Sequence, residues 1–454
     1  MSDDDLFDLG VSAKPDGASP IGDSGRLVSV VPERGIDRAG GATGAFTYLL
    51  PSELGELSVG ERVRIPLGRG NRPVSGVVVG IDVDPPEGLT SVKPVLGREG
   101  TALGPELVEL AIWLGRYYCC PLGMVLATML PAAVKKGTGR KREVLLEADR
   151  GADRAAIAEL PPTARAAWDA MVSRFGDDPG GWPRLTKKSL TSRLGLKTAA
   201  PLGRLVRAGL LREVERTVVR GSVEADLVSG PPEALPKLTP AQTRAIETVG
   251  SDLGRFAVHL MLGVTGSGKT EVYLRLLRRV LDRGESGLVL VPEISLTPQT
   301  AGRFVRRFAH EVDADGNPIG VAVLHSGLTA TQRHAEWRRV ESGEARIVIG
   351  ARSAIFAPFG EGEGAAKLGI VIVDEEHDGS YKQDQLPRYH ARDVALKRAQ
   401  LAGCPVLLGS ATPSLESWHN ARSGRYSLIE MPERVGGGVL PKVRIVDLAE
   451  ERRN

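Results

Sequence analysis

The sequence predicts a multidomain α/β protein with an N-terminal small β-rich domain, a winged-helix domain and a doubly wound parallel α/β lobe. Three observations support this class. The chain has 454 residues, more than one ordinary hydrophobic core accommodates. Short alternating runs broken by glycine and proline occupy residues 27–94. From Leu238 onward, apolar β-branched runs alternate with amphipathic stretches, as in a parallel sheet covered by helices.

The N-terminal region divides into a tail and a folded domain. Residues 1–24 are rich in Asp, Gly, Ser and Pro, which predicts a disordered tail, and they lack the apolar stretch of a signal peptide. Residues 25–134 include the runs RLVSVVP, GAFTYLLP and ERVRIPLG, whose spacing predicts a small β-barrel or sandwich. The stretch 106–131 has helical periodicity, and we expect it to pack across that barrel.

A compact helical unit is predicted for residues 152–229, after the basic connection KKGTGRKRE. Three stretches have helical patterns, and TVVRGSVEADLV has the pattern of a two-stranded ribbon. Three helices followed by a ribbon outline a winged helix, a variant of the helix-turn-helix. An unspecialised helical spacer fits the same spacing. We expect residues 230–237, GPPEALPK, to be a linker.

Residues 238–440 are predicted to form the α/β lobe. The expected strands are FAVHLML, GLVLVP, VAVLH, RIVIG, LGIVIVDEE and CPVLLGS. Their continuous apolar character is typical of strands that are buried on both faces. Amphipathic stretches such as TEVYLRLLRRVLDRG lie between them, and these are expected to be the covering helices.

A glycine-rich loop in this lobe has the spacing of a phosphate-binding site. It is part of MLGVTGSGKTEVYL, residues 261–274, and lies between an apolar strand and an amphipathic helix. In this context loop amides and the helix N-terminus bind phosphates. Lys269 is expected to reach the β- and γ-phosphates of ATP, and Thr270 to offer its hydroxyl to Mg²⁺. The predicted phosphate-binding residues are Gly263, Thr265, Gly266, Ser267, Gly268, Lys269 and Thr270.

The other half of such a site is an acidic group at the end of a buried strand, which LGIVIVDEEH (368–377) supplies. We expect Asp374 to hold Mg²⁺ and Glu375 to orient and deprotonate the attacking water. With Lys269, these are the predicted catalytic residues for hydrolysis of a nucleoside triphosphate. Two roles remain open for His377, relay of the nucleotide state or capping of the strand.

Further polar stretches border the expected site. LTPAQTRAIETV (238–249) begins with a capped helix bearing Gln242, whose amide can pair with adenine. The loops VPEISLTPQ, GARSAIFAPF and LGSATPSLES follow expected strands, and ligands bind at this edge of an open α/β sheet. Arg352, Ser410 and Thr412 are therefore predicted to contact the phosphates of a DNA strand. Plain polar turns are the alternative for each loop.

Aromatic residues are only 4% of the chain, yet several gather in DGSYKQDQLPRYHARD, residues 378–393. We predict that Tyr381 and Tyr389 stack on unpaired bases while Lys382 and Arg388 hold phosphates. The loop would then report DNA occupancy to Glu375. The alternative is a packed loop whose tyrosines face the core.

Composition limits the remaining classes. The three cysteines form no CxxC pair, so we expect no disulfide framework and no zinc site in this sequence. There is no run of about 18 apolar residues, the minimum for a membrane helix. A cytoplasmic location, with no membrane partner, is the simplest expectation.

Taken together, GVTGSGKTEVY, VPEISLTPQ, GARSAIFAPF, DEEHDGSYKQ…RYHARD and LGSATPSLES resemble the primosomal protein N′ (PriA) family of replication-restart DNA helicases, in superfamily 2. FTYLLP, GERVRIPLG, VKPVLG and WLGRYYCCPLGMVL are similar to the family's domain for the 3′ end of a nascent strand. The resemblance implies a RecA-like helicase lobe and ATP-dependent 3′→5′ unwinding at branched or stalled forks. It also implies branched and single-stranded DNA, primosome-loading proteins and single-stranded DNA-binding protein as partners.

The resemblance assigns further residues. Phe46 and Lys93 match the family's pocket for the 3′-terminal nucleotide. Where the family commonly has Asp between two aromatics, this sequence has Thr47, which can accept a hydrogen bond but carries no charge. The segment 378–393 matches an aromatic-rich loop that couples DNA binding to ATP hydrolysis.

The family pattern continues into a second helicase lobe and an eight-cysteine module that binds two zinc ions. Residues 441–454 match the start of that lobe. An arginine from the second lobe reaches the γ-phosphate, and such a residue contributes several orders of magnitude to turnover. If the 454 residues are the whole product, we expect ATP binding with weak or no unwinding. Two function classes remain, a replication-restart helicase and a fork-DNA-binding platform that binds ATP without unwinding.

Overall fold

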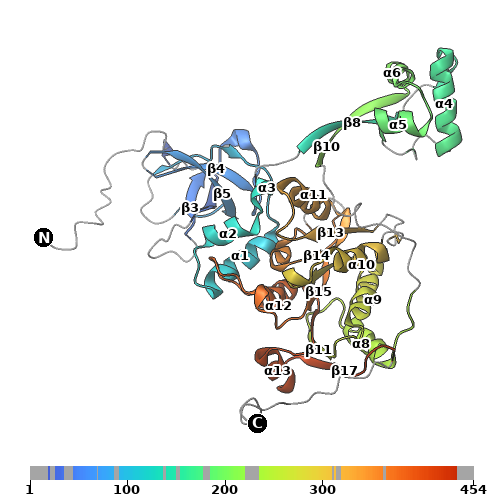
Figure 1. Cartoon of the computed structure of the whole chain (residues 1–454). Helices are drawn as coiled ribbons and strands as arrows, with labels where there is room; N and C mark the ends of the chain where they lie inside the picture. Colours follow the sequence, from blue (N-terminus) through green and yellow to red (C-terminus); the bar gives the residue numbers. More distant parts are fainter. Residues whose placement is uncertain are drawn as a thin grey trace, which may run out of the picture. The chain divides into compact units, whose positions relative to one another are not determined.

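The described chain divides into two units, one formed by Met1–Gly137 with Gly221–Asn454 and the other by Thr138–Arg220 (Figure 1). The computed structural model describes residues 19–20, 26–34, 44–68, 70–85, 91–135, 140–149, 154–176, 182, 185–219, 235–308, 311–312, 319–360 and 365–436. Most of the expected tail and linker, and residues 441–454, lie outside these ranges. Within the expected tail, Ser19–Pro20 forms a short strand, β1, antiparallel to β6 (Ser91–Val92).

A five-stranded antiparallel sheet, in the order β3-β2-β5-β4-β7, forms the N-terminal domain. Its strands are β2 (Leu27–Pro32), β3 (Phe46–Leu49), β4 (Arg62–Leu67), β5 (Arg72–Ile81) and β7 (Gly97–Arg98). Alternating valine and isoleucine side chains of β2, β4 and β5 are buried together on one face. The β-branched periodicity of the sequence thus produces the expected half-buried strands.

The stretch 106–131, which has helical periodicity, forms two helices, α1 (Pro105–Tyr117) and α2 (Leu122–Met129), and a short α3 (Ala132–Lys135) follows them. Cys119 has a φ of 49°, a left-handed conformation that ends a helix, and Pro121 precedes the first residue of α2. A side chain at Gly123 would overlap the carbonyl oxygen of Pro32. The glycine therefore allows α2 to lie directly against the end of β2.

The unit Thr138–Arg220 contains α4 (Pro162–Phe175), α5 (Lys187–Arg193) and α6 (Ala200–Arg207) around a core that includes Trp168 and Trp182. Its sheet has the order β10-β8-β9, from β8 (Arg140–Ala148), β9 (Leu185–Thr186) and β10 (Leu211–Val219). Of the ribbon expected within residues 217–228, only residues 217–219 are described, where they form the end of β10, and the rest lies outside the described residues. The last four residues of the basic connection begin β8, which pairs antiparallel with β10 along its length. The winged-helix assignment stays a prediction.

The α/β lobe is built on a seven-stranded parallel sheet, in the order β13-β14-β12-β15-β16-β11-β17. The strands are β11 (Val258–Gly263), β12 (Ser286–Leu290), β13 (Gly320–Leu324), β14 (Ala345–Gly350), β15 (Leu368–Asp374), β16 (Val406–Ser410) and β17 (Ser427–Met431). The helices are α8 (Pro240–Gly250), α9 (Lys269–Asp282), α10 (Pro298–Phe308), α11 (Ala330–Glu341), α12 (Ala391–Ala402) and α13 (Leu415–Arg422). The edge strand β17 was absent from the sequence expectations.

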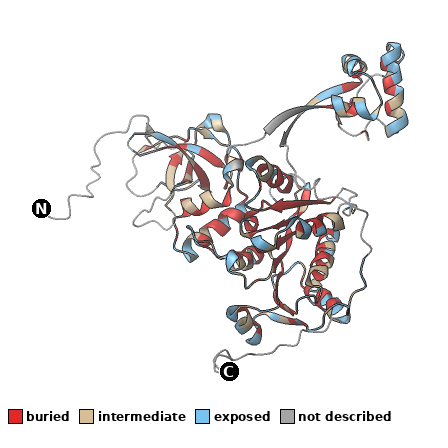
Figure 2. Cartoon of the chain, viewed as in Figure 1, coloured by how far each residue is buried: buried red, intermediate tan, exposed pale blue. Residues whose placement is uncertain are grey.

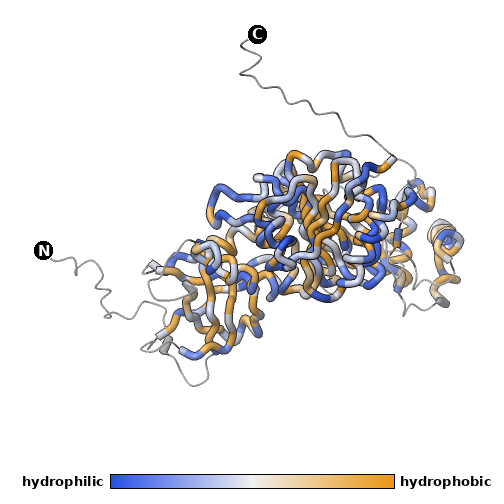
Figure 3. Tube along the Cα trace, turned by 90° about the horizontal axis from the view of Figure 1, so that it is seen from below, coloured by the Kyte–Doolittle hydropathy of each residue, from blue (hydrophilic) through white to orange (hydrophobic). Residues whose placement is uncertain are grey.

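Helices cover both faces of this sheet, as the continuous apolar strands predict. Alternate strand side chains pack with α8, α9 and α10 on one face and with α11 and α12 on the other. Apart from the edge strand β17, the strands are almost entirely buried (Figure 2), and hydrophobic segments gather in the interior of the lobe (Figure 3). Helices α1 and α2 of the N-terminal domain share the α12-side core. No helix among the described residues has the length and apolar character needed to cross a membrane.

Candidate nucleotide-binding site

The glycine loop connects β11 to α9, which begins at Lys269. Gly266 and Gly268 have φ values of 84° and 82°, a region that glycine adopts without steric cost. A side chain at Gly268 would overlap the amide of Gln242. The Nζ of Lys269 donates to the carbonyl of Gly263 at 3.0 Å and lies 3.4 Å from Oε1 of Glu375. The predicted phosphate lysine and the predicted base are thus neighbours.

A cavity of about 460 Å³ opens over this loop. The loop residues 264–270, which include every predicted phosphate-binding residue except Gly263, line it together with Pro236, Lys237, Gln242, Glu271, Arg303, Asp374, Glu375 and Val435. Its volume lies within the range of small-molecule sites. Both halves of the predicted nucleotide site therefore face one hollow.

Two buried tyrosines hold Asp374 at the end of β15. Tyr273 of α9 donates to its Oδ1 at 2.7 Å, and Tyr381 donates to its main-chain carbonyl at 2.6 Å. Burial raises the pKa of Asp374, and the Tyr273 hydrogen bond opposes that shift. Burial also raises the pKa of Tyr273 well above its ordinary value. Burial raises the pKa of Tyr381 in the same way, so both hydroxyls remain protonated donors, Tyr273 to the carboxylate of Asp374 and Tyr381 to its main-chain carbonyl.

Glu375 has a φ of 45°, an uncommon conformation for a residue with a side chain. Strained positions of this kind concentrate at functional sites. The Glu375 side chain is 34% exposed, whereas the adjacent Glu376 is fully buried. The turn after β15 therefore presents one carboxylate to the cavity and encloses the next.

Thr270 and Asp374 provide oxygen ligands of the kind that Mg²⁺ prefers. The Tyr273 hydrogen bond occupies Oδ1 of Asp374, and the second carboxylate oxygen can face a cation. Among the described residues, no three His, Cys, Asp or Glu side chains group closely enough for a metal cage. Mg²⁺ in nucleotide sites takes only one or two carboxylates, with phosphate oxygens and water, so the donor set fits.

Gln242 lies at the cavity, but its amide already has protein partners. Its Oε1 accepts from the main-chain N–H of Thr239 at 2.8 Å in a capping box, and its Nε2 donates to the carbonyl of Ser267 at 3.2 Å. The side chain is 3% exposed. In this conformation the amide joins the start of α8 to the glycine loop, so pairing with adenine requires it to leave those contacts.

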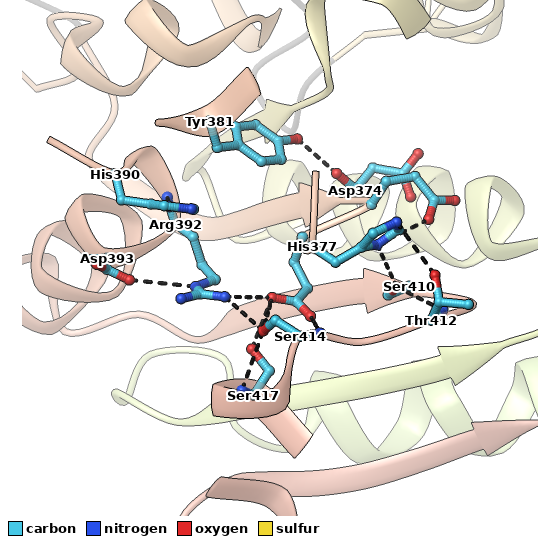
Figure 4. A network of polar contacts seen from close by, with 12 residues as sticks. Asp374, His377, Tyr381, His390, Arg392, Asp393, Ser410, Thr412, Ser414 and Ser417 are labelled. Atoms are coloured by element: carbon cyan, nitrogen blue, oxygen red, sulfur yellow. Dashed lines mark hydrogen bonds and ion pairs between the residues drawn. The ribbon is translucent and has the colours of Figure 1, made fainter. Parts of the chain in front are cut away.

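His377 contacts the loop after β16 (Figure 4). Its Nδ1 lies 2.8 Å from Oγ of Ser410, and its Nε2 lies 3.3 Å from Oγ1 of Thr412. Ser410 is fully buried, so its predicted direct contact with DNA phosphates is wrong. The geometry favours the relay role for His377, because the imidazole bridges Glu375, 3.8 Å away, to the loop that follows β16.

Glu376 is the centre of a buried polar cluster, and its partners Arg392, Ser414 and Ser417 are labelled in Figure 4. It accepts from the main-chain N–H of Ser414 at 2.7 Å, the hydroxyl of Ser417 at 2.8 Å and the guanidinium of Arg392 at 3.0 Å. A buried carboxylate is stable only when it is paired in this way. The cluster ties the DEEH turn to the start of α12 and the start of α13.

The loop 378–393 packs with its tyrosines inward, which was the alternative expectation. Tyr381 is fully buried and Tyr389 is 1% exposed, against Phe356 at a ring distance of 5.2 Å. Stacking of these two rings on DNA bases is therefore wrong for this structure, because neither presents a free face. The exposed side chains of the loop include Lys382 and Arg388.

Arg352 supports this loop. Its guanidinium donates to the carbonyls of Ser380, at 3.2 Å, and Lys382, at 2.5 Å. The guanidinium predicted to contact a DNA phosphate is thus hydrogen-bonded to the loop 378–393 in this structure. Lys382 donates in turn to the carbonyl of Arg388 at 2.5 Å, which closes the loop on itself.

The predicted 3′-end residues gather in the N-terminal domain. Phe46 and Thr47 begin β3, and the main chain of Lys93 accepts from Leu49 of the same strand at 2.9 Å. The Lys93 ammonium donates to the carbonyl of Gly68 at 2.8 Å. The structure therefore brings the FTY motif and Lys93 to one region of the domain.

The sequence did not predict the residues whose hydrogen bonds position the site without lining the cavity, which are Tyr273, Glu376, Arg392, Ser414 and Ser417. Tyr273 is one turn beyond Lys269, at a spacing that could have indicated a shared helix face. The partners of Glu376 come from two distant segments. No local sequence signal identifies them.

Comparison with known proteins gives two family matches. Residues 239–421 match the DEAD/DEAH box helicase family, and residues 36–131 match the family described as 3′DNA-binding domain (3′BD). The first match contains the glycine loop, the DEEH turn and the loop after β16. The second contains Phe46, Thr47 and Lys93.

Curated relatives extend these matches. The replication restart protein PriA of Bacillus subtilis (strain 168) is 46% identical over 272 residues, which cover 60% of this chain and 31% of that protein. The PriA of Chlamydia pneumoniae is 35% identical over 415 residues, 89% of this chain and 52% of that protein. The chain thus spans about half the length, or less, of these relatives. A solved structure of RecG bound to a three-way DNA junction aligns with 45% of this chain and 25% of its own, at 24% identity and a TM-score of 0.31.

Proposed function

The chain belongs to the family of the replication restart protein PriA, and on that premise we propose that it is an ATP-dependent 3′→5′ DNA helicase of replication restart. It recognises branched or stalled forks and nascent 3′ ends. The observation that carries the proposal is the approach of Lys269 Nζ to within 3.4 Å of Glu375 Oε1. This distance puts a phosphate-binding cation and a general base on one cavity, as hydrolysis of a nucleoside triphosphate requires.

The residues of the cavity divide the chemistry among them. Amides of the loop 263–270 and the N-terminus of α9 hold the phosphates, and Lys269 leaves Glu375 for the γ-phosphate when ATP binds. Glu375 is then free to orient and deprotonate the attacking water. Thr270 and Asp374 would hold Mg²⁺, whose charge stabilises the charge that develops on the phosphates.

Two regions of the chain are proposed to bind DNA. The 3′BD match and the gathering of Phe46, Thr47 and Lys93 support recognition of a 3′ end by the N-terminal domain. Lys382 and Arg388 are exposed on the loop 378–393 and supply cations for a DNA backbone. We propose single-stranded DNA-binding protein and primosome-loading proteins as partners, and the cytoplasm as the place of action.

The test is ATP turnover by the purified chain, with and without forked DNA. The proposal expects turnover that forked DNA stimulates and that Lys269→Ala abolishes. Tight fork binding with ATP binding but no turnover would instead support the fork-binding platform. Forks with a free or a phosphate-blocked 3′ end test the N-terminal domain, and equal affinities would remove 3′-end recognition from the proposal.

A further inference from the structure

The end of α1 in the N-terminal domain contacts the root of the loop 378–393. The hydroxyl of Tyr118 accepts from the main-chain N–H of His390 at 3.0 Å and donates to the carboxylate of Asp393 at 3.3 Å. Burial raises the pKa of Tyr118, so the hydroxyl keeps the proton that it donates. One side chain thus holds both the last loop residue before α12 and the first turn of that helix.

From Asp393 a chain of polar contacts continues to the DEEH turn (Figure 4). Oδ1 of Asp393 lies 3.3 Å from Nε of Arg392, and the same guanidinium donates to Glu376 at 3.0 Å. Glu376 directly precedes His377 and follows the predicted base, Glu375. Four side chains therefore connect the N-terminal domain to the residue beside the base without a break.

The other end of the loop reaches the same turn by a different contact. Tyr381 donates to the carbonyl of Asp374 at 2.6 Å. Lys382 lies 5.4 Å from the centre of the Tyr118 ring, within the range of a cation–π interaction. The loop therefore contacts Tyr118 at both of its ends, and at one end it also contacts the main chain of Asp374, the residue predicted to hold Mg²⁺.

These contacts lie beside a packed interface between α1 and α12. Arg398 of α12 is fully buried, donates to the carbonyl of Ala357 at 2.6 Å and lies 3.4 Å from the carboxylate of Glu106 in α1. Helices α1 and α12 also share one hydrophobic core. A shift at the end of α1 is therefore transmitted to α12 rather than absorbed by a loose interface.

We propose that Tyr118 is a positioning residue through which DNA bound to the N-terminal domain changes the affinity of the nucleotide site for ATP. This inference rests on the proposed function, because it assumes that the N-terminal domain binds DNA and that the cavity binds ATP. Tyr118 touches neither ligand. It acts through Asp393, Arg392 and Glu376 on the turn that carries Asp374 and Glu375.

The test measures the affinity of the full chain for a fluorescent ATP analogue in three states: without DNA, with a fork bearing a free 3′ end, and with the same fork blocked by a 3′-phosphate. The coupling is the ratio of nucleotide affinities with the free-ended and the blocked fork. The variants are Tyr118→Phe, Asp393→Asn and their combination. Tyr117→Phe is the matched control, since this neighbouring tyrosine is 59% exposed.

Tyr118→Phe is expected to reduce the coupling ratio about fivefold. Its affinity for the fork and its DNA-free nucleotide affinity should stay within about twofold of wild type, since the ring and its packing remain. The double variant should lose no more than either single variant, because both break the same chain. Tyr117→Phe should retain the wild-type ratio.

An unchanged coupling ratio in Tyr118→Phe would overturn the inference. Equal losses of nucleotide affinity with and without DNA would overturn it too, because they indicate a structural role for Tyr118. A wild-type chain without coupling would overturn it as well. Because the coupling is a ratio of binding affinities, it can be measured whether or not the chain hydrolyses ATP. Wild-type turnover tests the proposed function separately.

Discussion

The hydroxyl of Tyr381 donates a 2.6 Å hydrogen bond to the main-chain carbonyl of Asp374. A loop expected to respond to DNA is thereby joined to the residue expected to hold Mg²⁺. Tyr381 is fully buried, and Asp374 is partly buried. Any movement of the loop root therefore moves the end of β15.

Tyr381→Phe should lower DNA-stimulated ATP turnover several-fold while leaving the KM for ATP nearly unchanged. The substitution keeps the ring in place and removes one buried hydrogen bond, worth about 1 kcal/mol. Steady-state turnover at saturating fork DNA is the measurement. Thr128→Val is the control, because the partly buried Thr128 also donates to a main-chain carbonyl, that of Met124, at 2.9 Å and lies outside both proposed sites. Equal effects of the two substitutions would contradict a specific role for Tyr381.

Glu375→Gln should reduce turnover by about 10²–10⁴-fold, the usual contribution of a general base. Affinity for ATP should be retained or increased, because the amide no longer holds the Lys269 ammonium at 3.4 Å. Single-turnover hydrolysis and nucleotide titration separate the two effects. Glu293→Gln, at a carboxylate outside the cavity lining, is the control. Normal turnover in Glu375→Gln would exclude this residue as the base.

Glu376→Ala should lower the free energy of unfolding by about 3 kcal/mol or more, because it removes the buried carboxylate that accepts from Arg392, Ser414 and Ser417 and leaves their donors without this acceptor. Glu375→Ala should change it by less than about 1 kcal/mol, since its carboxylate is partly exposed and its ion pair is weakened by water. Urea unfolding of the two adjacent variants makes the comparison. Similar losses would mean that the cluster around Glu376 does not stabilise the turn.

Gly409→Ala should weaken Mg²⁺-dependent nucleotide binding. A methyl group at this position in β16 would overlap the Tyr273 hydroxyl, which holds Oδ1 of Asp374. Gly379→Ala, where a side chain would meet open space, is the matched control. Titration of a fluorescent ATP analogue at varied Mg²⁺ concentration gives the readout, and equal Mg²⁺ dependence in both variants would contradict the supporting role of Tyr273.

His259 should make the chain less stable in mild acid. It is 1% exposed within β11, and burial lowers its pKa even though Nε2 lies 3.0 Å from Asp252. The unfolded chain therefore binds a proton more readily, so stability is complete above about pH 6.5 and falls as the pH drops below that value. One such group contributes at most about 1.4 kcal/mol per pH unit. Unfolding between pH 5 and 7.5 should show a shallower acid slope for His259→Gln than for wild type, and equal slopes would assign the acid sensitivity to other groups.

The sequence by itself determined the parts that depend on local pattern. The spacing around Lys269, the buried strand before Asp374 and the alternation of strands with amphipathic helices specified a parallel lobe with a phosphate loop and an acidic turn. These features depend on neighbouring residues along the chain, because strand burial and loop geometry follow from periodicity and glycine placement. The sequence did not predict the edge strand β17, because a short, half-exposed segment has only a weak hydrophobic pattern.

Tertiary structure decided where the side chains of the loop 378–393 point. The composition of the loop fits stacking on bases as well as packing in a core. Tyr389 packs in the core because it contacts Phe356, and Tyr381 does so because it donates to Asp374. It also decided that β8 pairs with β10, and that Tyr118 meets His390 and Asp393. Such contacts join residues far apart in the chain. They form only when separate elements pack, so no local sequence signal contains them.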